Sequence, residues 1–356
     1  MVQEAGILDN LTSALEAALP GARVSLKRSS AAASRIEGIA DVRFEGERFR
    51  VLVEVNARSS SGSLQQAAEH LASRLERTGE GTIGLVVAPY LGPRHREQLR
   101  DLGVNFLDLC GNAWIRHGGI HVDRQGFANR FSEQRVGRDP FADKASLILR
   151  ELLRDPGRGW GVRELASELR LDPGFVSRMG RELEGLGYAA REAGRLKLRD
   201  ARSVLDDWAH AYSYRRNRMR GYYRQVKEPL ELLAGLRAAR VPGGTVYALS
   251  LQAGAHLVDH HARFSEVHVY VQDETAEHAL RDALDLVQVD EGADVWLMSP
   301  YYRHSVFDGL REVDGLPVVS DVQLYLDLYS YPLRGAEQAE HLYASVIEPT
   351  LPAGMR

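Results

Sequence analysis

The sequence predicts a multidomain α/β (α+β) protein, in which a short helical domain lies between two domains that combine strands with helices. The chain has 356 residues, enough for two or three domains. Apolar residues make up 44% of it and charged residues 26%, the balance of ordinary globular domains. In the first and last thirds of the chain, β-branched apolar runs alternate with amphipathic helical patterns.

Composition also predicts where the protein resides. Its one cysteine, Cys110, excludes an intramolecular disulfide framework and fits a reducing compartment. The first residues lack the pattern of a signal peptide, and no apolar run approaches the roughly 18 residues that span a bilayer. We therefore expect a cytoplasmic location without a membrane segment.

Residues 1–135 predict the first α/β domain, with a mixed sheet. An amphipathic pattern over residues 7–19 ends at Pro20-Gly21, and Glu45-Gly46-Glu47 marks a hairpin turn. Strands are predicted over 22–28, 38–46, 48–56, 82–90, 104–110 and 113–122, and further helices over 64–77 and 94–103. The polar stretch 132–140 is the predicted linker to the next domain.

Residues 141–200 carry the most specific pattern in the chain. Helical periodicity over 142–155 and 163–170 is followed by the turn Leu171-Asp172-Pro173 and a third helix over 174–187. Asp172 suits the N-cap of that third helix, and Pro173 suits its first position. An alternating segment around Glu192-Ala193-Gly194 predicts a two-stranded wing. This order is typical of a winged helix-turn-helix, whose third helix enters the major groove of DNA.

The predicted DNA contacts of this domain are polar and basic side chains. Ser177, Arg178 and Arg181 fall on the exposed half of the third helix, and Arg195, Lys197 and Arg199 fall on the wing. The alternative is a winged helix that binds only another protein.

Residues 201–356 predict a long helix over 201–225 and then a second α/β domain. Although the whole chain has a formal net charge of −4, residues 212–227 hold no acidic residue. The arginines Arg215, Arg216, Arg218 and Arg220, with Tyr214, Tyr222 and Tyr223 on either side of them, predict a surface for phosphates and stacked bases. The alternative is a solvated basic helix that pairs with acidic neighbours.

Two acids on consecutive predicted strands suggest a metal-dependent alternative. Asp41 and Glu54, with Asn56 and then Gln66 (or Gln65) on the next helix, resemble the PD-(D/E)XK restriction-endonuclease-like fold. Carboxylates on adjacent strands can share a Mg²⁺ ion for phosphodiester cleavage. Because Asn56 stands where that family has lysine, the resemblance implies a nuclease-like domain without activity. The alternative is a Mg²⁺-dependent nuclease, with the winged helix as its targeting module.

No other cofactor or metal site is predicted. The sequence has neither a phosphate-binding loop nor a dinucleotide-binding glycine fingerprint. His256 and His260 are spaced for a shared metal, but no third ligand accompanies them. We expect no cofactor.

Nearly the whole chain resembles one bacterial family. Residues 85–116, 208–218 and above all 316–342, LPVVSDVQLYLDLYSYPLRGAEQAEHL, are similar to the AbiEi-like antitoxins of type IV toxin–antitoxin systems and related transcriptional regulators. The resemblance implies a winged helix that represses its own operon and an antitoxin that opposes a nucleotidyltransferase toxin. Founding antitoxins begin with the winged helix, whereas a nuclease-like domain precedes it here.

Together these patterns predict a three-domain, sequence-specific regulator of transcription that binds double-stranded DNA. The predicted domains are 1–135, 141–200 and 201–356. A homodimer would match palindromic half-sites. A third class of function is a pure interaction protein, an antitoxin that blocks a toxin directly.

Overall fold

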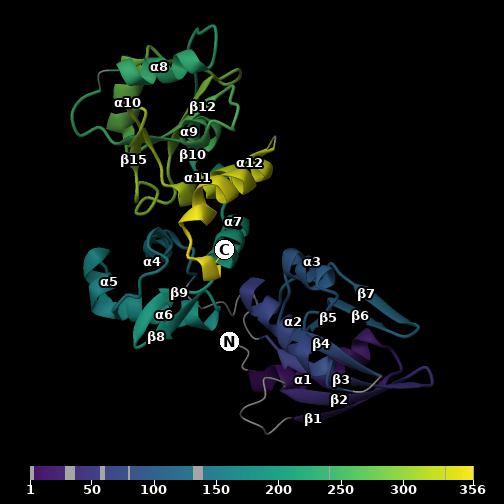
Figure 1. Cartoon of the computed structure of the whole chain (residues 1–356). Coiled ribbons are helices and arrows are strands. Elements are labelled where there is room, and N and C mark those ends of the chain that lie inside the picture. Colours follow the sequence, from purple (N-terminus) through teal and green to yellow (C-terminus); the bar gives the residue numbers. More distant parts are fainter. Residues whose placement is uncertain are drawn as a thin grey trace. The chain divides into compact units, whose positions relative to one another are not determined.

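The computed structural model describes residues 4–28, 37–56, 61–78, 81–130, 139–239, 241–332 and 334–355 (Figure 1). The chain divides into two compact units. The N-terminal unit comprises Met1–Arg138 and Arg181–Tyr188, and the C-terminal unit comprises Asp139–Gly180 and Ala189–Arg356. Residues 131–138 of the predicted linker lie outside the described residues. The division of the C-terminal unit into a winged helix and a further domain stays a prediction.

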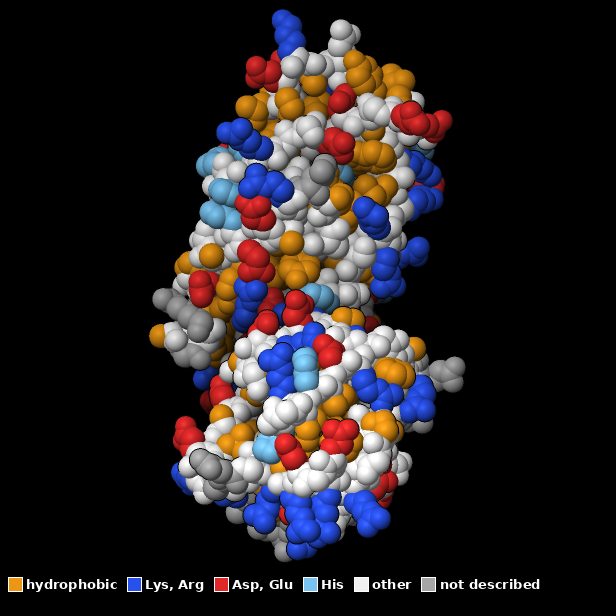
Figure 2. Space-filling model, turned by 90° about the vertical axis from the view of Figure 1, so that its right-hand side faces the viewer, with side chains coloured by type: hydrophobic (Ala, Val, Ile, Leu, Met, Phe, Trp, Pro, Cys, Tyr) orange, Lys and Arg blue, Asp and Glu red, His pale blue; other side chains and the backbone are white. Residues whose placement is uncertain are grey.

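Both units combine helices with a large mixed sheet, which confirms the predicted mixed α/β class. Within the described ranges, no helix has the length and apolar character needed to cross a membrane. Basic and acidic side chains both occur across the face of the molecule drawn in Figure 2.

The sheet of the N-terminal unit follows the chain order from β1 to β7. Pairing is antiparallel from β1 to β3, parallel from β3 to β5 and antiparallel again from β5 to β7. The strands are β1 (Arg23–Arg28), β2 (Gly38–Phe44), β3 (Glu47–Val55), β4 (Thr82–Ala88), β5 (Asn105–Asp108), β6 (Ala113–His117) and β7 (Ile120–Arg124).

A two-residue turn fixes the register of β2 and β3. Glu45 and Gly46 both have positive φ, 49° and 88°, as the tightest hairpin turns require. The turn places Phe44 opposite Glu47, and Asp41 opposite Arg50. Because side chains alternate between the faces of a sheet, this register decides which residues of β2 and β3 lie together.

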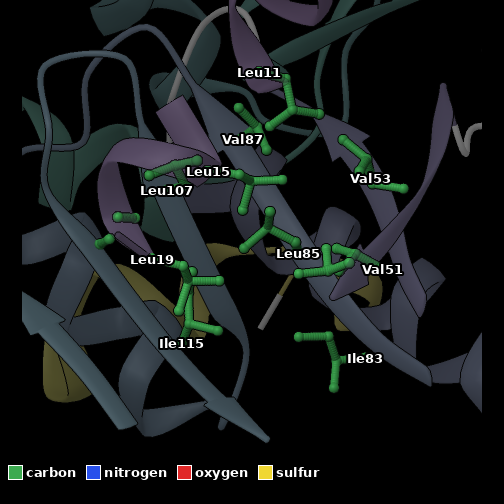
Figure 3. Packing of buried hydrophobic residues seen from close by; sticks show 14 of the residues in the cluster. Leu11, Leu15, Leu19, Val51, Val53, Ile83, Leu85, Val87, Leu107 and Ile115 are labelled. Atoms are coloured by element: carbon green, nitrogen blue, oxygen red, sulfur yellow. The ribbon is translucent and has the colours of Figure 1, made fainter. Parts of the chain in front are cut away.

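Helices cover both faces of this sheet. One face packs on α1 (Glu4–Ala18), whose Leu11 and Leu15, with Leu19 just after the helix, meet alternate residues of the central strands, as Figure 3 shows. The opposite face packs on α2 (Ser61–Leu75) and α3 (Pro93–Asp101). Strands buried on both sides therefore read as continuous apolar runs, as in β4.

The C-terminal unit begins with three helices and a hairpin. These are α4 (Asp143–Arg154), α5 (Val162–Glu168), α6 (Pro173–Gly185), β8 (Ala189–Glu192) and β9 (Arg195–Leu198). The last residues of α6, from Arg181, are those assigned to the N-terminal unit.

A second seven-stranded sheet follows, in the order β13-β10-β14-β12-β11-β16-β15. Its strands are β10 (Arg218–Tyr223), β11 (Tyr247–Ser250), β12 (Val267–Val271), β13 (Val287–Gln288), β14 (Val295–Ser299), β15 (Arg311–Val313) and β16 (Leu316–Val318). The helices are α7 (Ala201–Ala211), α8 (Leu230–Ala238), α9 (Leu251–Asp259), α10 (Glu274–Ala283), α11 (Asp321–Tyr329) and α12 (Gly335–Leu342).

The predicted helix over 201–225 is wrong beyond residue 211. After α7 the chain makes a single 3-10 turn (Tyr214–Arg216) and enters β10, which pairs with β14. Gly221 permits this arrangement, because a side chain at that position would bring its Cβ within 2.9 Å of the Ala293 Cβ. Local periodicity indicated a helix, and long-range strand pairing decided the structure.

A buried carboxylate organises the centre of the C-terminal unit. Asp327 on α11 has no exposed surface. It accepts hydrogen bonds from Ser250 (2.6 Å), Tyr212 (2.7 Å), Tyr270 (3.0 Å) and the Gln323 amide (3.0 Å). Burial raises the pKa of Asp327 to about 6, and these four hydrogen bonds oppose the rise.

Helix α4 is fastened to this centre. The Arg150 guanidinium is buried and donates to Gln323 Oε1 at 2.6 Å. At the start of α4, the Asp143 carboxylate accepts backbone N–H bonds from His304 (3.0 Å) and Ser305 (3.0 Å). Hydrogen bonds at both ends of the helix thus hold α4 against the sheet domain.

We expect the buried carboxylate to make the stability of the fold depend on pH. Because the folded pKa of Asp327 lies above its unfolded value, its contribution is complete below about pH 4 and is lost as pH rises through about 6. Asp327→Asn keeps an accepting oxygen but cannot ionise. The free energy of unfolding of this variant should therefore fall less than that of the wild type as pH rises, and the difference should be on the order of 2 to 3 kcal/mol. Denaturant titrations at pH 4.5 and 7 measure the difference.

Asp327→Ala is the contrasting variant. It removes the acceptor that four buried donors share, and should cost about 3 kcal/mol or more at either pH. Parallel pH curves for wild type and Asp327→Asn would contradict this assignment.

Candidate nucleic-acid interface

Helices α4, α5 and α6 share an apolar core. Leu149 on α4, Leu165 on α5 and Val176 on α6 are all buried. The small residue Ala166 is 2% exposed, as expected where helices cross closely.

The hairpin β8–β9 is joined to this core by a third short strand pairing. Trp160 bridges to Leu196 through two backbone hydrogen bonds of 2.7 Å and 2.8 Å. The Trp160 ring is buried, and the Arg158 guanidinium lies 3.6 Å from the centroid of that ring. The predicted elements of residues 141–200 are therefore present in the predicted order.

The third helix starts where the sequence predicts. The Asp172 carboxylate accepts the backbone N–H of Phe175 at 2.8 Å, which is the N-cap interaction, and Pro173 is the first helical residue. Arg170, at φ 52°, turns the chain into this cap.

One side of α6 is buried and the other faces solvent. Val176, Met179 and Gly180 are buried, whereas Arg178 and Arg181, three positions apart, are exposed. Ser177 is half-buried beside them. The nearest acid to Arg178 is Asp172, at 3.9 Å, and the Arg178 side chain is 41% exposed. The exposed side of α6 therefore presents two guanidinium groups.

The cations of the hairpin are placed differently from one another. Arg195 donates to Glu164 at 2.6 Å and to the Gly159 carbonyl at 2.8 Å. Lys197 lies 3.3 Å from Glu192. Arg199 is exposed and, within the described ranges, makes no ion pair. Of the three predicted contacts on the wing, only Arg199 thus has its charge fully available.

Two of the three tyrosines of the predicted basic surface over 212–227 are not accessible. Tyr214 and Tyr222 are buried and offer no stacking surface, whereas Tyr223 is 44% exposed. The buried rings belong to the core of the sheet domain.

The arginines of this segment mostly have partners. Arg220 donates to Glu277 at 2.6 Å, and Arg218 lies 3.6 Å from Glu274. Arg216 stacks on Tyr301 with 4.3 Å to the ring centroid, and Arg215 is exposed without an ion pair among the described residues. The alternative of a basic segment paired with acidic neighbours describes Arg218 and Arg220 correctly.

The Glu277 carboxylate illustrates how these charges are balanced. Burial raises the pKa of Glu277, but hydrogen bonds from Arg220 and Tyr222 outweigh it, and the net shift is downward. Burial and the Glu277 bond raise the pKa of Tyr222 to about 12. Arg220 is therefore committed to a half-buried ion pair.

In the N-terminal unit, the predicted pair of acids does not meet. Asp41 lies opposite Arg50, so four strand positions separate it from Glu54, about 14 Å at 3.4 Å per residue. Mg²⁺ binds its ligands at about 2.0 to 2.1 Å, too short for one ion to join both carboxylates. Asp41 instead lies 3.5 Å from Arg50.

The side chains that lie around Glu54 differ from those that the sequence predicted. By the same register Glu37 precedes β2 across from Glu54, and its carboxylate accepts the Val55 N–H at 2.8 Å. His70 on α2 lies 3.2 Å from Glu54 Oε1. Asn56 donates to Ser63 Oγ at 3.1 Å. The hairpin turn in the sequence could have identified Glu37.

The two glutamines proposed for this site lie on α2. Gln65 donates to Glu69 at 3.0 Å, and Gln66 is half-buried. Over the described part of the chain, no group of three or more His, Cys, Asp or Glu side chains is placed to hold a metal ion.

In a comparison with known proteins, a family model matches part of the C-terminal unit. Residues 197–348, most of the sheet domain of the C-terminal unit, match the family model described as "Transcriptional regulator, AbiEi antitoxin, Type IV TA system". No curated protein matches the chain.

Two solved structures are weakly similar. EndoMS in its apo form is 22% identical, with a TM-score of 0.23, over 30% of this chain and 46% of that one. The EndoMS–dsDNA2 complex is 21% identical, with a TM-score of 0.24, over 30% of this chain and 44% of that one. The chain thus spans less than half the length of either structure. Residues 197–348 are similar to AbiEi-type transcriptional regulators.

Proposed function

We propose that the protein is a sequence-specific DNA-binding regulator of transcription, and that residues 141–200 are its winged helix. The observation that carries this proposal is the exposed side of α6, where Arg178 and Arg181 face solvent while Val176 and Met179 are buried. The adjoining match of residues 197–348 to a family of transcriptional regulators supports the same role.

In this proposal α6 lies in the major groove. A guanidinium can donate two parallel hydrogen bonds to guanine, so Arg178 and Arg181 would read bases, and Ser177 can bond a base edge or a phosphate. Arg199, after the hairpin, would contact the backbone beside the groove. Because Arg195 and Lys197 already have acidic partners, we expect them to contribute less to the affinity for DNA.

Replacing both α6 arginines tests the proposal. Arg178→Ala with Arg181→Ala should weaken binding to the preferred site by about 1 to 3 kcal/mol per lost base contact, and should blur the preference over unrelated DNA. Genomic fragments selected by the wild-type protein provide the site, and mobility shifts at fixed salt measure the affinities.

The matched control is Arg263→Ala with Arg303→Ala, which removes two exposed cations that lie outside α6. It should leave the ratio of specific to non-specific affinity unchanged. Equal ratios for the α6 variant and the wild type would disprove the assignment of α6 as the reading helix.

We further propose that the regulator is an autoregulating antitoxin that acts as a homodimer. The matched family model names type IV toxin–antitoxin antitoxins. A two-fold dimer would place two α6 helices on half-sites about one helical turn of DNA apart, so the preferred site should be palindromic.

Growth assays test the antitoxin role. Expression of the neighbouring gene alone should arrest growth, and co-expression of this chain should restore it. The α6 double variant should still restore growth when both genes have foreign promoters, because DNA reading is then not required. Failure of the wild-type chain to restore growth would refute the antitoxin role and leave DNA binding untouched.

For the N-terminal unit we propose a restriction-endonuclease-like scaffold without nuclease activity. The separation of Asp41 from Glu54, and Asn56 in place of a lysine, support this proposal. The runner-up is a Mg²⁺-dependent nuclease, in which Glu54 would have to act without Asp41.

Incubation with plasmid DNA and Mg²⁺ or Mn²⁺ distinguishes the two. We expect the DNA to stay supercoiled at every protein concentration. Cleavage that Glu54→Gln abolishes and Asp41→Asn leaves intact would instead establish an active nuclease built on the residues around Glu54.

A further inference from the structure

Part of one face of the N-terminal sheet is open to solvent and strongly basic. It is formed by alternate residues of β1, β2 and the first half of β3. Their side chains lie on the same face of the sheet as α2, but α2 does not cover them. We call it the cationic sheet face; its residues are Arg23, Ser25, Lys27, Asp41, Arg43, Arg48 and Arg50.

Cross-strand register stacks these charges directly beside one another. Arg23 lies opposite Arg43, and Arg43 lies opposite Arg48, which makes a row of three exposed arginines across three strands. In the next row Ser25, Asp41 and Arg50 are neighbours. The row after that ends at Leu52, which is buried in the core that α2 covers.

The acids of the hairpin leave most of this charge unbalanced. Asp41, the one acid of the face, lies 3.5 Å from Arg50. Arg23, Lys27, Arg43 and Arg48 have no ion-pair partner among the residues that the structure describes. Glu47 points to the opposite face and lies against Gly118. Five cations and one acid give the face a charge of +4, in a chain whose net charge is −4.

Such an arrangement is unfavourable for the fold alone. Like charges directly opposite in an antiparallel pair destabilise a sheet. Charged residues on an edge strand prevent sheets from aggregating, which can account for Arg23 and Lys27 on β1. It cannot account for Arg43 and Arg48, because β2 and β3 are inner strands.

We infer that the cationic sheet face binds the phosphate backbone of double-stranded DNA without reading its sequence. A row of guanidinium groups suits a row of phosphates, each able to accept two hydrogen bonds. The face has no aromatic side chain on which unpaired bases could stack, which disfavours single-stranded nucleic acid. Figure 2 shows Lys and Arg side chains gathered at the lower end of the view, at the height of β1 and β2 in Figure 1.

This surface lies on a different unit from Arg178 on α6, and its role goes beyond the proposed one. Base reading by α6 would decide where the protein binds, whereas the sheet face would add affinity for any duplex. The two contributions can be measured separately, because backbone contacts set the salt dependence and base contacts set the specificity ratio.

The test uses the full chain with Arg43→Gln and Arg48→Gln. Each lost phosphate contact lowers the slope of log affinity against log salt concentration by about 0.9, so the slope for random-sequence duplex DNA should fall by about 1.8. The ratio of specific to random affinity should stay the same. Without DNA, the variant should unfold at the same temperature or a higher one, since like-charge neighbours have been removed.

The matched control is Arg77→Gln with Arg263→Gln, which changes the net charge equally but lies off the face. Its slope should change by less than half as much. Equal slopes for the test variant and this control would overturn the inference, and so would binding of anionic lipid vesicles that depends on Arg43 and Arg48 while duplex binding does not. If only the α6 variant of the preceding section loses DNA binding, the proposed function stands and this inference fails.

Discussion

The C-terminal unit depends on the way α4 is bound to the sheet domain. Asp143 at one end accepts backbone hydrogen bonds from His304 and Ser305, and Arg150 further along is buried against Gln323. Gln323 in turn donates to Asp327, the carboxylate around which the polar core is arranged. Breaking the link between Arg150 and Gln323 would leave a buried charge unsatisfied, so α4 and the sheet domain are stabilised together.

The order of elements could be predicted from the sequence because the signals were local. The Asp172 cap, the proline after it and the glycine of the Glu45-Gly46 turn each act within a few residues, and all are observed in their predicted roles. The same holds for the exposed side of α6, since helical periodicity places Arg178 and Arg181 opposite Val176.

The predictions that were wrong concerned contacts set by strand pairing and register. The segment from Tyr212 has a helical spacing, but most of its tyrosines are buried in the sheet domain, and β10 pairs with β14, a strand more than seventy residues later. The pairing of Asp41 with Glu54 assumed that acids on neighbouring strands meet. Register decides this, and the two-residue turn already implied that Arg50 and not Glu54 faces Asp41. Ion pairs such as Arg195 with Glu164 join separate elements, so composition alone could not reveal them.

The attachment of α4 ties the first helix of the C-terminal unit to one loop of the sheet domain. Its contacts reach the segment between β14 and β15, through Ser305 and through the Tyr302 hydroxyl, which donates to the Phe141 carbonyl just before the helix. Arg154 extends the contact to Asp308 at 2.6 Å. The position of this loop therefore fixes where α4 lies within the C-terminal unit.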